Sequence, residues 1–317
     1  MDEIYKLAAP SSTVAPVAAA DGRLDALFAR WIEFIDIRPA SVEIYASATR
    51  LFLRWLRENS IANPRREDIL AYRRYLEMTR KPTTVQLYII AVRQFFAWLE
   101  IEGIYKNIVQ HVKSPKIERL HKKDYLTSSQ ARNVLGRIER HTERGQRDYA
   151  MLSLMVTGGL RRIEVSRANI EDIRTVGDST RLYIQGKGKD ERADYVKLPQ
   201  PVELAVRDYL SARGKPVPTA PLFVSTSNNN HGERLTVRSI SGIVKERLRA
   251  AGYDSDRLTA HSLRHSAVTL ALLSGQSLQD VQQFARHTAI TTTMIYAHNI
   301  DRENNRCAES VAEVIFA

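Results

Sequence analysis

The chain has 317 residues, of which 44% are hydrophobic, so it can form proper cores and is not an intrinsically disordered chain. The formal charge of +11 and the pI of about 9.7 suit a polyanionic partner such as nucleic acid, although many basic proteins bind none. The single cysteine, Cys307, excludes an internal disulfide and a cysteine-based zinc site.

Residues 1–22 are predicted to form a flexible tail. The segment is acidic at its start and is interrupted by Pro10 and Pro16, so it lacks the basic region and the continuous apolar region of a signal peptide. No later stretch approaches the roughly 18 apolar residues of a membrane helix. Together with the lone cysteine, these features predict a soluble, cytoplasmic protein with no membrane partner.

A helical domain is predicted over residues 23–112. Apolar residues recur at spacings of three and four in four segments, and the breaks between them fall near Pro39, Pro64 and Pro82. The four predicted helices cover residues 24–35, 41–59, 66–78 and 83–103. We expect the three tryptophans of the chain in the core of this domain.

Residues 113–125 are polar and basic, and they are predicted to link two domains. This segment contains five cations, Lys113, Lys116, Arg119, Lys122 and Lys123. Cations in such a linker are either simply solvated or lie along a sugar–phosphate backbone, and the sequence leaves both open. If the second holds, these residues bind DNA.

The second domain, residues 126–317, is predicted to be mostly helical with one small antiparallel β-sheet. Helices are predicted over residues 127–138, 147–159, 202–212, 236–252, 259–272 and 277–286. Residues 180–185 and 193–198 alternate like strands, and "GKGKDER" joins them as a hairpin turn. The predicted fold class is therefore mainly α with a small antiparallel sheet, in two domains.

The helix predicted over residues 259–272 has three cationic or titratable groups on one face. His261, Arg264 and His265 are three and four residues apart, which places them on the same side. His261 and His265 also have the spacing of a zinc-binding helix. However, Ser262 stands where the zinc-protease pattern requires glutamate, and Arg264 would place a positive charge beside the metal. We therefore expect a phosphate here and no metal.

Two further segments add cations and a nucleophile. "GGLRRIEV" (158–165) places Arg161 directly after a double glycine, and Tyr296 follows His287 by nine residues. Guanidinium groups suit bidentate contact with a phosphate, and their charge matches the charge that develops on a phosphorane. A tyrosine can attack phosphorus if such cations stabilise its anion. These residue types suit attack of a tyrosine on a phosphate.

In order and local spacing, these residues resemble those of the tyrosine site-specific recombinases, the integrase family that includes lambda integrase, Cre and the Xer proteins. The resemblance covers about residues 24–317 and implies six catalytic residues: Arg161, Lys187, His261, Arg264, His287 and Tyr296. It also implies that Glu164 is a buried partner of the first arginine or of His261. Arg162 and Lys189 remain alternatives to Arg161 and Lys187. The sequence departs from the family at Ala285–Arg286, where leucine–glycine is usual, so the turn before His287 is expected to differ.

The resemblance also implies a mechanism. The two domains would close around duplex DNA as a C-shaped clamp, and four protomers would act on two duplexes with short inverted-repeat core sites. Tyr296 would form a 3′-phosphotyrosyl link while Lys187 protonates the leaving 5′-oxygen, without a metal or another cofactor. The apolar cluster near the C-terminus lies on a predicted helix and comprises Val311, Val314, Ile315 and Phe316. It either packs on its own domain or, as the family favours, docks on a neighbouring protomer.

Three other functions are compatible with parts of the pattern. They are a DNA-binding regulator that no longer cleaves, a type IB topoisomerase, and a metal-dependent nuclease. The complete set of catalytic residue types disfavours the first, the helical first domain disfavours the second, and a chelator would identify the third. The target DNA sequence, any accessory proteins, and the choice between integration or excision and dimer resolution do not follow from the sequence.

Overall fold

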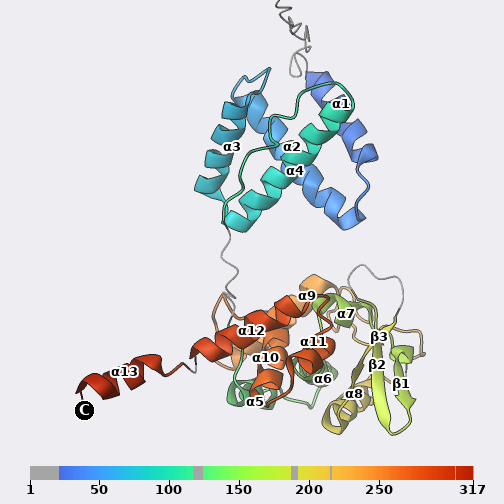
Figure 1. The fold of residues 1–317 in the computed structure, drawn as a ribbon. Helices are drawn as coiled ribbons and strands as arrows, with labels where there is room; N and C mark the ends of the chain where they lie inside the picture. The colour runs from blue at the N-terminus through green and yellow to red at the C-terminus, as the bar shows by residue number, and fades with distance from the viewer. Residues whose placement is uncertain (1–20, 117–123, 187–191, 215, 304, 317) are drawn as a thin grey trace, which may run out of the picture. The chain divides into compact units, whose positions relative to one another are not determined.

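A computed structural model describes residues 21–116, 124–186, 192–214, 216–303 and 305–316 of the chain. The chain divides into two compact units, Met1–Arg119 and Leu120–Ala317, and the division falls within the segment predicted as a linker (Figure 1). Within the described ranges, no helix is both long enough and apolar enough to cross a membrane.

Over its described residues, 21–116, the first unit contains four helices, as predicted (Figure 1). They are α1 (Asp21–Phe34), α2 (Pro39–Glu58), α3 (Arg66–Thr79) and α4 (Pro82–Ile101). Helices α2 and α4 each begin with a proline, whose fixed φ and missing N–H suit the first helical turn. Trp31, Trp55 and Trp98 are buried in the core of this unit, which confirms their predicted position. Helix α1 begins at Asp21, so the helix starts inside the segment predicted as a tail.

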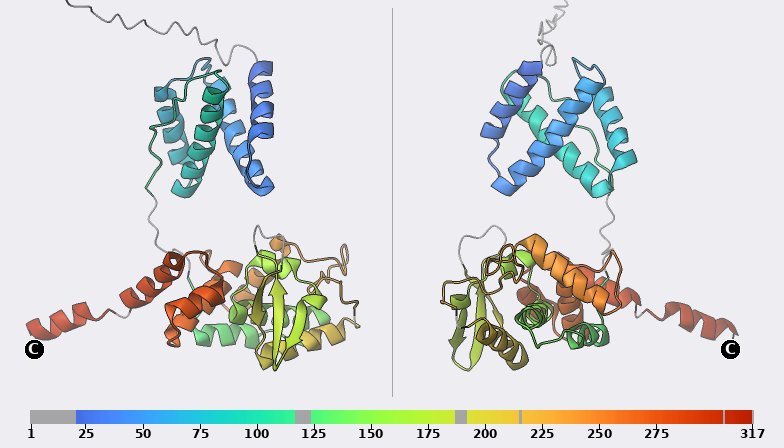
Figure 2. Two further views of the ribbon diagram at one scale, coloured as in Figure 1. Left: turned by 45° about the vertical axis from the view of Figure 1, so that its right-hand side comes forward. Right: turned by 180° about the vertical axis from the view of Figure 1, so that it is seen from behind.

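The second unit is mostly helical, and several of its helices pack against α10. They are α5 (Ser128–Gly136), α6 (Glu143–Gly158), α7 (Arg162–Arg167), α8 (Gln200–Ala212), α9 (Val237–Ala250), α10 (Ala260–Leu273), α11 (Leu278–Ala285), α12 (Ile290–Glu303) and α13 (Cys307–Phe316). Helix α10 contacts α6, α9, α11 and α12 (Figure 2). The sequence pattern did not predict α7, which is shorter than two turns, or α12, which begins with a β-branched run that disfavours helix.

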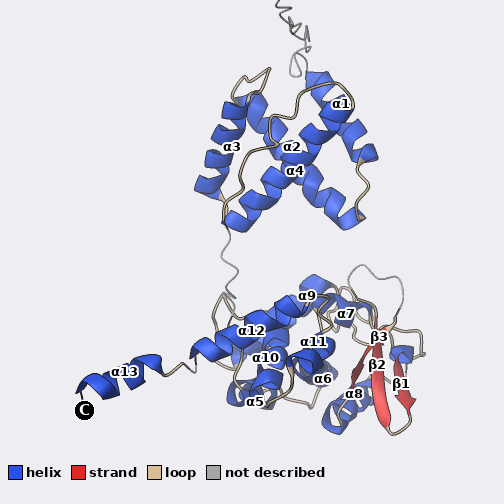
Figure 3. Ribbon diagram, viewed as in Figure 1, coloured by secondary structure: helices blue, strands red, loops and turns tan. Residues whose placement is uncertain are grey.

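A three-stranded antiparallel sheet lies at one end of this unit, beside α8 (Figure 3). It comprises β1 (Ile173–Val176), β2 (Ser179–Ile184) and β3 (Asp194–Lys197), in that order. The hairpin of β2 and β3 was predicted, and Leu182 pairs with Val196 on its buried face. Strand β1 was missed because three of its four residues are exposed, so it has no alternating pattern.

Two turns with left-handed backbone conformation end the helices that lead to the candidate site. Helix α6 ends at Gly159, which has a φ of 58°. A Cβ on Gly159 would lie 3.4 Å from the Phe284 ring, so both the conformation and the close approach favour glycine. Helix α11 ends at Arg286, which has a φ of 55° and is not a glycine. Such a conformation is uncommon for a residue with a side chain.

Helix α6 is held in place by a buried ion-pair network. Asp148 is fully buried, and its two carboxylate oxygens accept hydrogen bonds from Arg147 and from Arg247 of α9. Arg147 also donates to the carbonyl of Val224 and to the hydroxyl of Thr226. A buried carboxylate shared by two arginines is stabilising only while all its partners are present. The network therefore fixes the helix whose C-terminus carries Gly159.

We predict that Asp148→Asn lowers the free energy of unfolding by about 3–5 kcal/mol, because it leaves two arginines without their buried counter-charge. The change is measured by urea denaturation. Glu246→Gln is the matched control, because Glu246 pairs with Arg144 on the surface. It should cost less than about 1 kcal/mol. Equal effects of the two substitutions would show that the buried network does not stabilise the unit.

Candidate active site

The first predicted arginine lies at the start of α7. The Arg161 backbone N–H donates to one carboxylate oxygen of Glu164 at 2.8 Å, and its guanidinium donates to the other, also at 2.8 Å. Glu164 is almost fully buried, whereas the Arg161 side chain is 32% exposed. The carboxylate therefore holds Arg161 by two groups at once, and the guanidinium still reaches solvent. Such a fixed, partly exposed cation can receive an anionic ligand.

The second predicted arginine, Arg264 of α10, is buried beneath this turn. One of its terminal nitrogens donates to the Gly159 carbonyl at 2.5 Å, and the other donates to the Ala285 carbonyl. These carbonyls lie at the C-terminal ends of α6 and α11, where the helix leaves acceptors unpaired and attracts positive charge. Burial, with Arg161 and Arg286 nearby, lowers the pKa of Arg264 to about 10, so it stays charged at neutral pH.

A third arginine, Arg286, lies in the same cluster. Its guanidinium donates to the carbonyls of Gly159 at 2.9 Å and Phe284 at 2.8 Å, and to Glu164 at 3.2 Å. The Arg286 carbonyl in turn accepts from Arg161 at 3.3 Å. Burial lowers the pKa of Arg286, while the Glu164 carboxylate opposes that change. Three arginines thus converge on one buried carboxylate and two helix ends.

The predicted nucleophile and histidines lie around this cluster. The Tyr296 ring of α12 is 5.1 Å from the His265 ring and 6.0 Å from the His287 ring, measured between centroids. The His265 ring is 4.6 Å from the His261 ring. His287 Nδ1 lies 3.0 Å from the hydroxyl of buried Thr293, an interaction that orients the imidazole. The rings of His261, His265, Tyr296 and His287 thus form a row of neighbours, which we call the histidine row. His261 is exposed, so this row begins at the surface.

Tyr296 is itself 5% exposed and packs against Val268, Val281 and Ala285. Burial raises the pKa of Tyr296 above its usual 10, while Arg264 and Arg161 oppose the rise by stabilising the phenolate. The phenol is therefore protonated at neutral pH in the free protein. It lies close enough to both arginines for their charges to act on its ionisation.

Of the predicted catalytic residues, the structure brings five together: Arg161, His261, Arg264, His287 and Tyr296, with Glu164 among them. Arg162, the alternative to Arg161, is exposed and donates to Ser241 at 2.6 Å instead. Lys187 and its alternative Lys189 lie outside the described residues, as do the linker residues Arg119, Lys122 and Lys123. Lys113 and Lys116 are exposed in the segment after α4.

Sequence reasoning missed two residues of this cluster and assigned one correctly to packing. Thr293 has no signal beyond its position six residues after His287. Arg286 appeared only as a departure from the leucine–glycine pattern, and its contacts with the end of α6 could not be anticipated. His265 is buried between His261 and Tyr296, as its predicted packing role requires.

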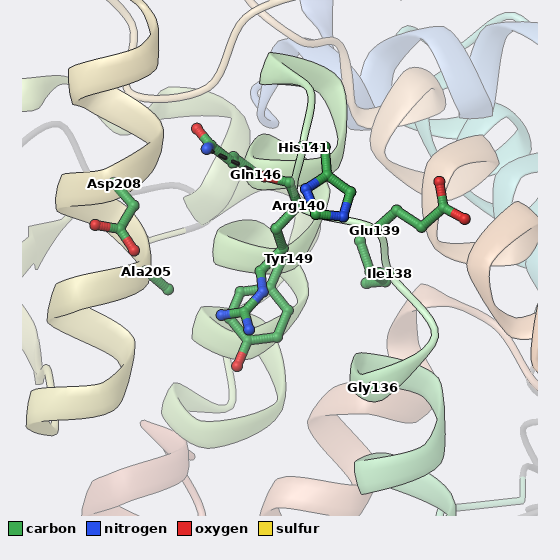
Figure 4. A pocket seen from close by; sticks show the side chains of 9 residues that line it. All are labelled: Gly136, Ile138, Glu139, Arg140, His141, Gln146, Tyr149, Ala205 and Asp208. Carbon is green, nitrogen blue, oxygen red and sulfur yellow. Dashed lines mark hydrogen bonds between the residues drawn. The ribbon is translucent and has the colours of Figure 1, made fainter.

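A pocket of about 500 Å³ lies elsewhere in the second unit (Figure 4). Its lining includes His141, Asp208 and Tyr149, and the Arg140 guanidinium stacks on the Tyr149 ring at 4.5 Å. None of the predicted catalytic residues that the structure describes lines it. No group of three or more histidine, cysteine or acidic side chains in the described ranges is arranged to hold a metal ion.

Comparison with known families agrees with this arrangement. Residues 124–303 match the model of the phage integrase family, and residues 29–103 match the N-terminal SAM-like domain of phage integrases. The chain belongs to the phage integrase family. The matched region contains the whole arginine cluster, the histidine row and Tyr296.

Relatives of this integrase-family chain include a tyrosine recombinase of Synechococcus elongatus, 30% identical over 208 residues, or 65% of this chain. Another is the tyrosine recombinase XerC of Caldanaerobacter subterraneus subsp. tengcongensis, 32% identical over 203 residues, or 63% of this chain. The alignments span 64% and 54% of these two relatives, so each relative extends beyond the matched region.

Solved structures share the fold. The XerH recombinase in a post-cleavage complex with palindromic difH DNA matches with a TM-score of 0.72 and 21% identity, covering 93% of this chain and 86% of that one. A lambda integrase dimer bound to a COC′ core site, comprising residues 75–356 of that protein, matches with a TM-score of 0.67 and 17% identity, covering 85% and 96%. At these identities the comparison establishes the two-domain architecture, mostly helical with a small sheet.

We predict that the Tyr296 phenol of this integrase-family chain titrates above pH 10 and that Arg161→Gln raises its pKa further, because a stabilising cation is removed. Since the pKa is higher in the folded than in the unfolded state, the wild type should lose stability relative to Tyr296→Phe as the pH rises past 10. NMR of ¹³C-labelled tyrosine measures the midpoint, with the signal assigned by its loss in Tyr296→Phe. Arg144→Gln, a distant surface change, is the control. A midpoint at or below 10 would contradict the prediction.

Proposed function

We propose that this protein is a site-specific DNA recombinase that cuts and rejoins DNA through a 3′-phosphotyrosyl intermediate at Tyr296. The observation that carries the proposal is the meeting of one tyrosine with two arginines that act on its ionisation and with two histidine rings. A tyrosine is a poor nucleophile at neutral pH unless cations stabilise the charge that develops during attack. In this site, the tyrosine and the cations that would stabilise its charge are all side chains of the second unit.

Each residue has a role in the proposed reaction. Arg161 and Arg264 bind the non-bridging oxygens of the scissile phosphate, and His261 and His287 donate further hydrogen bonds to it. Each terminal nitrogen of a guanidinium carries two hydrogens, so the bonds from Arg264 to the helix-end carbonyls leave donors for a phosphate. Glu164 orients Arg161. The freed 5′-hydroxyl of a partner strand then attacks the phosphotyrosine, so the bond energy is conserved without ATP.

The leaving 5′-oxygen needs a proton, and we assign that role to Lys187, with Lys189 as the alternative. A lysine near other cations has a depressed pKa and is suited to act as a general acid. The cationic side chains would supply the charge stabilisation that a metal supplies in other phosphoryl-transfer enzymes. The proposed reaction therefore proceeds in the presence of a chelator.

The proposed substrate is double-stranded DNA with short inverted-repeat core sites, in the cytoplasm. Two solved structures with the same fold support the choice of DNA site, since XerH is described on a palindromic site and lambda integrase on a core site. Lambda integrase is also described as a tetramer on a Holliday junction, which supports four protomers acting on two duplexes. The linker cations Lys113, Lys116, Arg119, Lys122 and Lys123 would contact the DNA backbone.

The decisive experiment is covalent trapping on a nicked suicide substrate in EDTA, after the bound site has been selected from a pool of random duplexes. We expect a denaturant-resistant complex of one protein per DNA strand with the wild type and none with Tyr296→Phe, because only the hydroxyl is missing.

Other outcomes favour the rival functions. Tight binding without covalent complex would indicate a non-cleaving regulator, and loss of cleavage in EDTA would indicate a metal-dependent nuclease. A covalent complex that persists in Tyr296→Phe would place the nucleophile elsewhere. Relaxation of supercoiled DNA by a single protomer, without strand exchange between duplexes, would indicate a type IB topoisomerase.

The C-terminal helix α13 gives a separate prediction about assembly. None of its residues is buried, and Val314 and Phe316 are each 85% exposed. We propose that this apolar face docks on a neighbouring protomer, since burial of such side chains is favourable. Val314→Ser with Phe316→Ser should leave the melting temperature of the monomer unchanged and weaken assembly on DNA, measured by light scattering. A lowered melting temperature would instead show that α13 packs on its own domain.

A further inference from the structure

Arg286 occupies a position whose backbone disfavours it. With a φ of 55°, it lies in the left-handed region, which glycine adopts without steric cost and other residues adopt at a penalty. Its charged side chain is only 8% exposed. The Nε atom is buried and has no hydrogen-bond partner among the described residues. Backbone strain, a buried charge and an unpaired donor all act against stability, so stability alone does not account for an arginine here.

The side chain of Arg286 joins two turns that are far apart in the sequence. It donates to the carbonyls of Gly158 and Gly159 at the end of α6, which are more than 120 residues away. These glycines immediately precede Leu160 and Arg161, while His287 follows Arg286 directly. One guanidinium therefore ties the turn that carries the first predicted catalytic arginine to the turn that carries a predicted catalytic histidine.

The same guanidinium shares the carboxylate that holds Arg161. One oxygen of Glu164 accepts from the Arg161 side chain, and the other accepts from the Arg161 backbone N–H and from Arg286. The Arg161 guanidinium completes the loop by donating to the Arg286 carbonyl. Arg161, Glu164 and Arg286 thus form a closed ring of hydrogen bonds, in which movement of one member displaces the other two.

We propose that Arg286 is a positioning residue of the site: by joining the α6–α7 turn, the α11–α12 turn and Glu164, it fixes Arg161 and His287 relative to each other. It acts beneath the phosphate-binding groups and does not touch the DNA. Its role rests on the proposed recombinase function, because the relative positions of Arg161 and His287 affect a reaction rate only if both residues take part in the reaction. The mutual geometry of the two turns is nevertheless a property of the free protein and can be measured without DNA.

The test compares Arg286→Gly with Arg286→Lys and the wild type. Glycine suits the left-handed backbone, so the first variant should remain folded, and its melting temperature is checked by circular dichroism. Lysine keeps the charge but offers a single nitrogen, which cannot reach both helix-end carbonyls and Glu164 in the way a planar guanidinium does. If charge alone mattered, Arg286→Lys would behave as the wild type. We expect it to behave as Arg286→Gly.

The first readout is amide hydrogen exchange of the free protein over residues 284–289, a segment in which the His287 N–H donates to Gln282. We expect faster exchange in both variants and no change in Arg144→Ala, a surface substitution in the same unit. Exchange as slow as in the wild type in Arg286→Gly would overturn the proposal, whether or not the protein cleaves DNA. This readout therefore separates failure of the inference from failure of the proposed function.

The second readout is the single-turnover rate of covalent complex formation, with DNA affinity measured in parallel. A misplaced catalytic group should lower the rate by about a hundredfold. The dissociation constant should stay within about threefold of the wild type, because Arg286 does not touch the substrate. Millimolar guanidinium chloride should restore part of the rate to Arg286→Gly, and ammonium chloride should not. A rate equal to that of the wild type, or a loss confined to affinity, would contradict the assignment.

Discussion

The bonds from Arg264 to the carbonyls of Gly159 and Ala285 are the interaction on which the rest of the site depends. Helices end with unpaired carbonyls and a partial negative charge, and a buried guanidinium satisfies two such ends at once. The α6–α7 turn and the α11–α12 turn are thereby brought against α10. Arg161 follows the first turn and His287 lies in the second, so this contact helps to place both residues near Tyr296.

Accumulating positive charge in a buried site requires compensation, and the structure supplies it in two forms. Glu164 provides one full negative charge, and the carbonyls at the ends of α6 and α11 provide partial ones. This compensation is incomplete, because three arginines lie near a single carboxylate, which pairs with only two of them, Arg161 and Arg286. Burial lowers the pKa of Arg264, and the remaining positive charge of Arg161 and Arg286 lowers it further. The same uncompensated charge makes an anionic phosphate a suitable ligand. The same positive charge stabilises Tyr296 only in its ionised form, the phenolate.

The sequence predicted most of the fold and, through the family resemblance, the candidate residues of the site and Glu164 as a buried partner of Arg161 or His261. It did not predict the other contacts that hold these residues together. Periodicity located the long helices, and the order of the motifs identified Arg161, Arg264 and Tyr296 as a set. It could not reveal β1 or α7, which are too short to show a pattern, or α12, which begins with β-branched residues. The role of Arg286 was beyond reach for a different reason. Its acceptors at Gly158 and Gly159 come within its reach only after α6 and α11 have both packed on α10.

The two helix ends that Arg264 joins constrain which residue can occupy this position in homologues. Lysine has the same charge, but its single nitrogen cannot span two helix ends as a planar guanidinium does. The residue is therefore constrained by folding before any reaction takes place. Invariance of arginine at this position across homologues would record an architectural requirement as much as a chemical one. It could persist in descendants that had lost the ability to cut DNA.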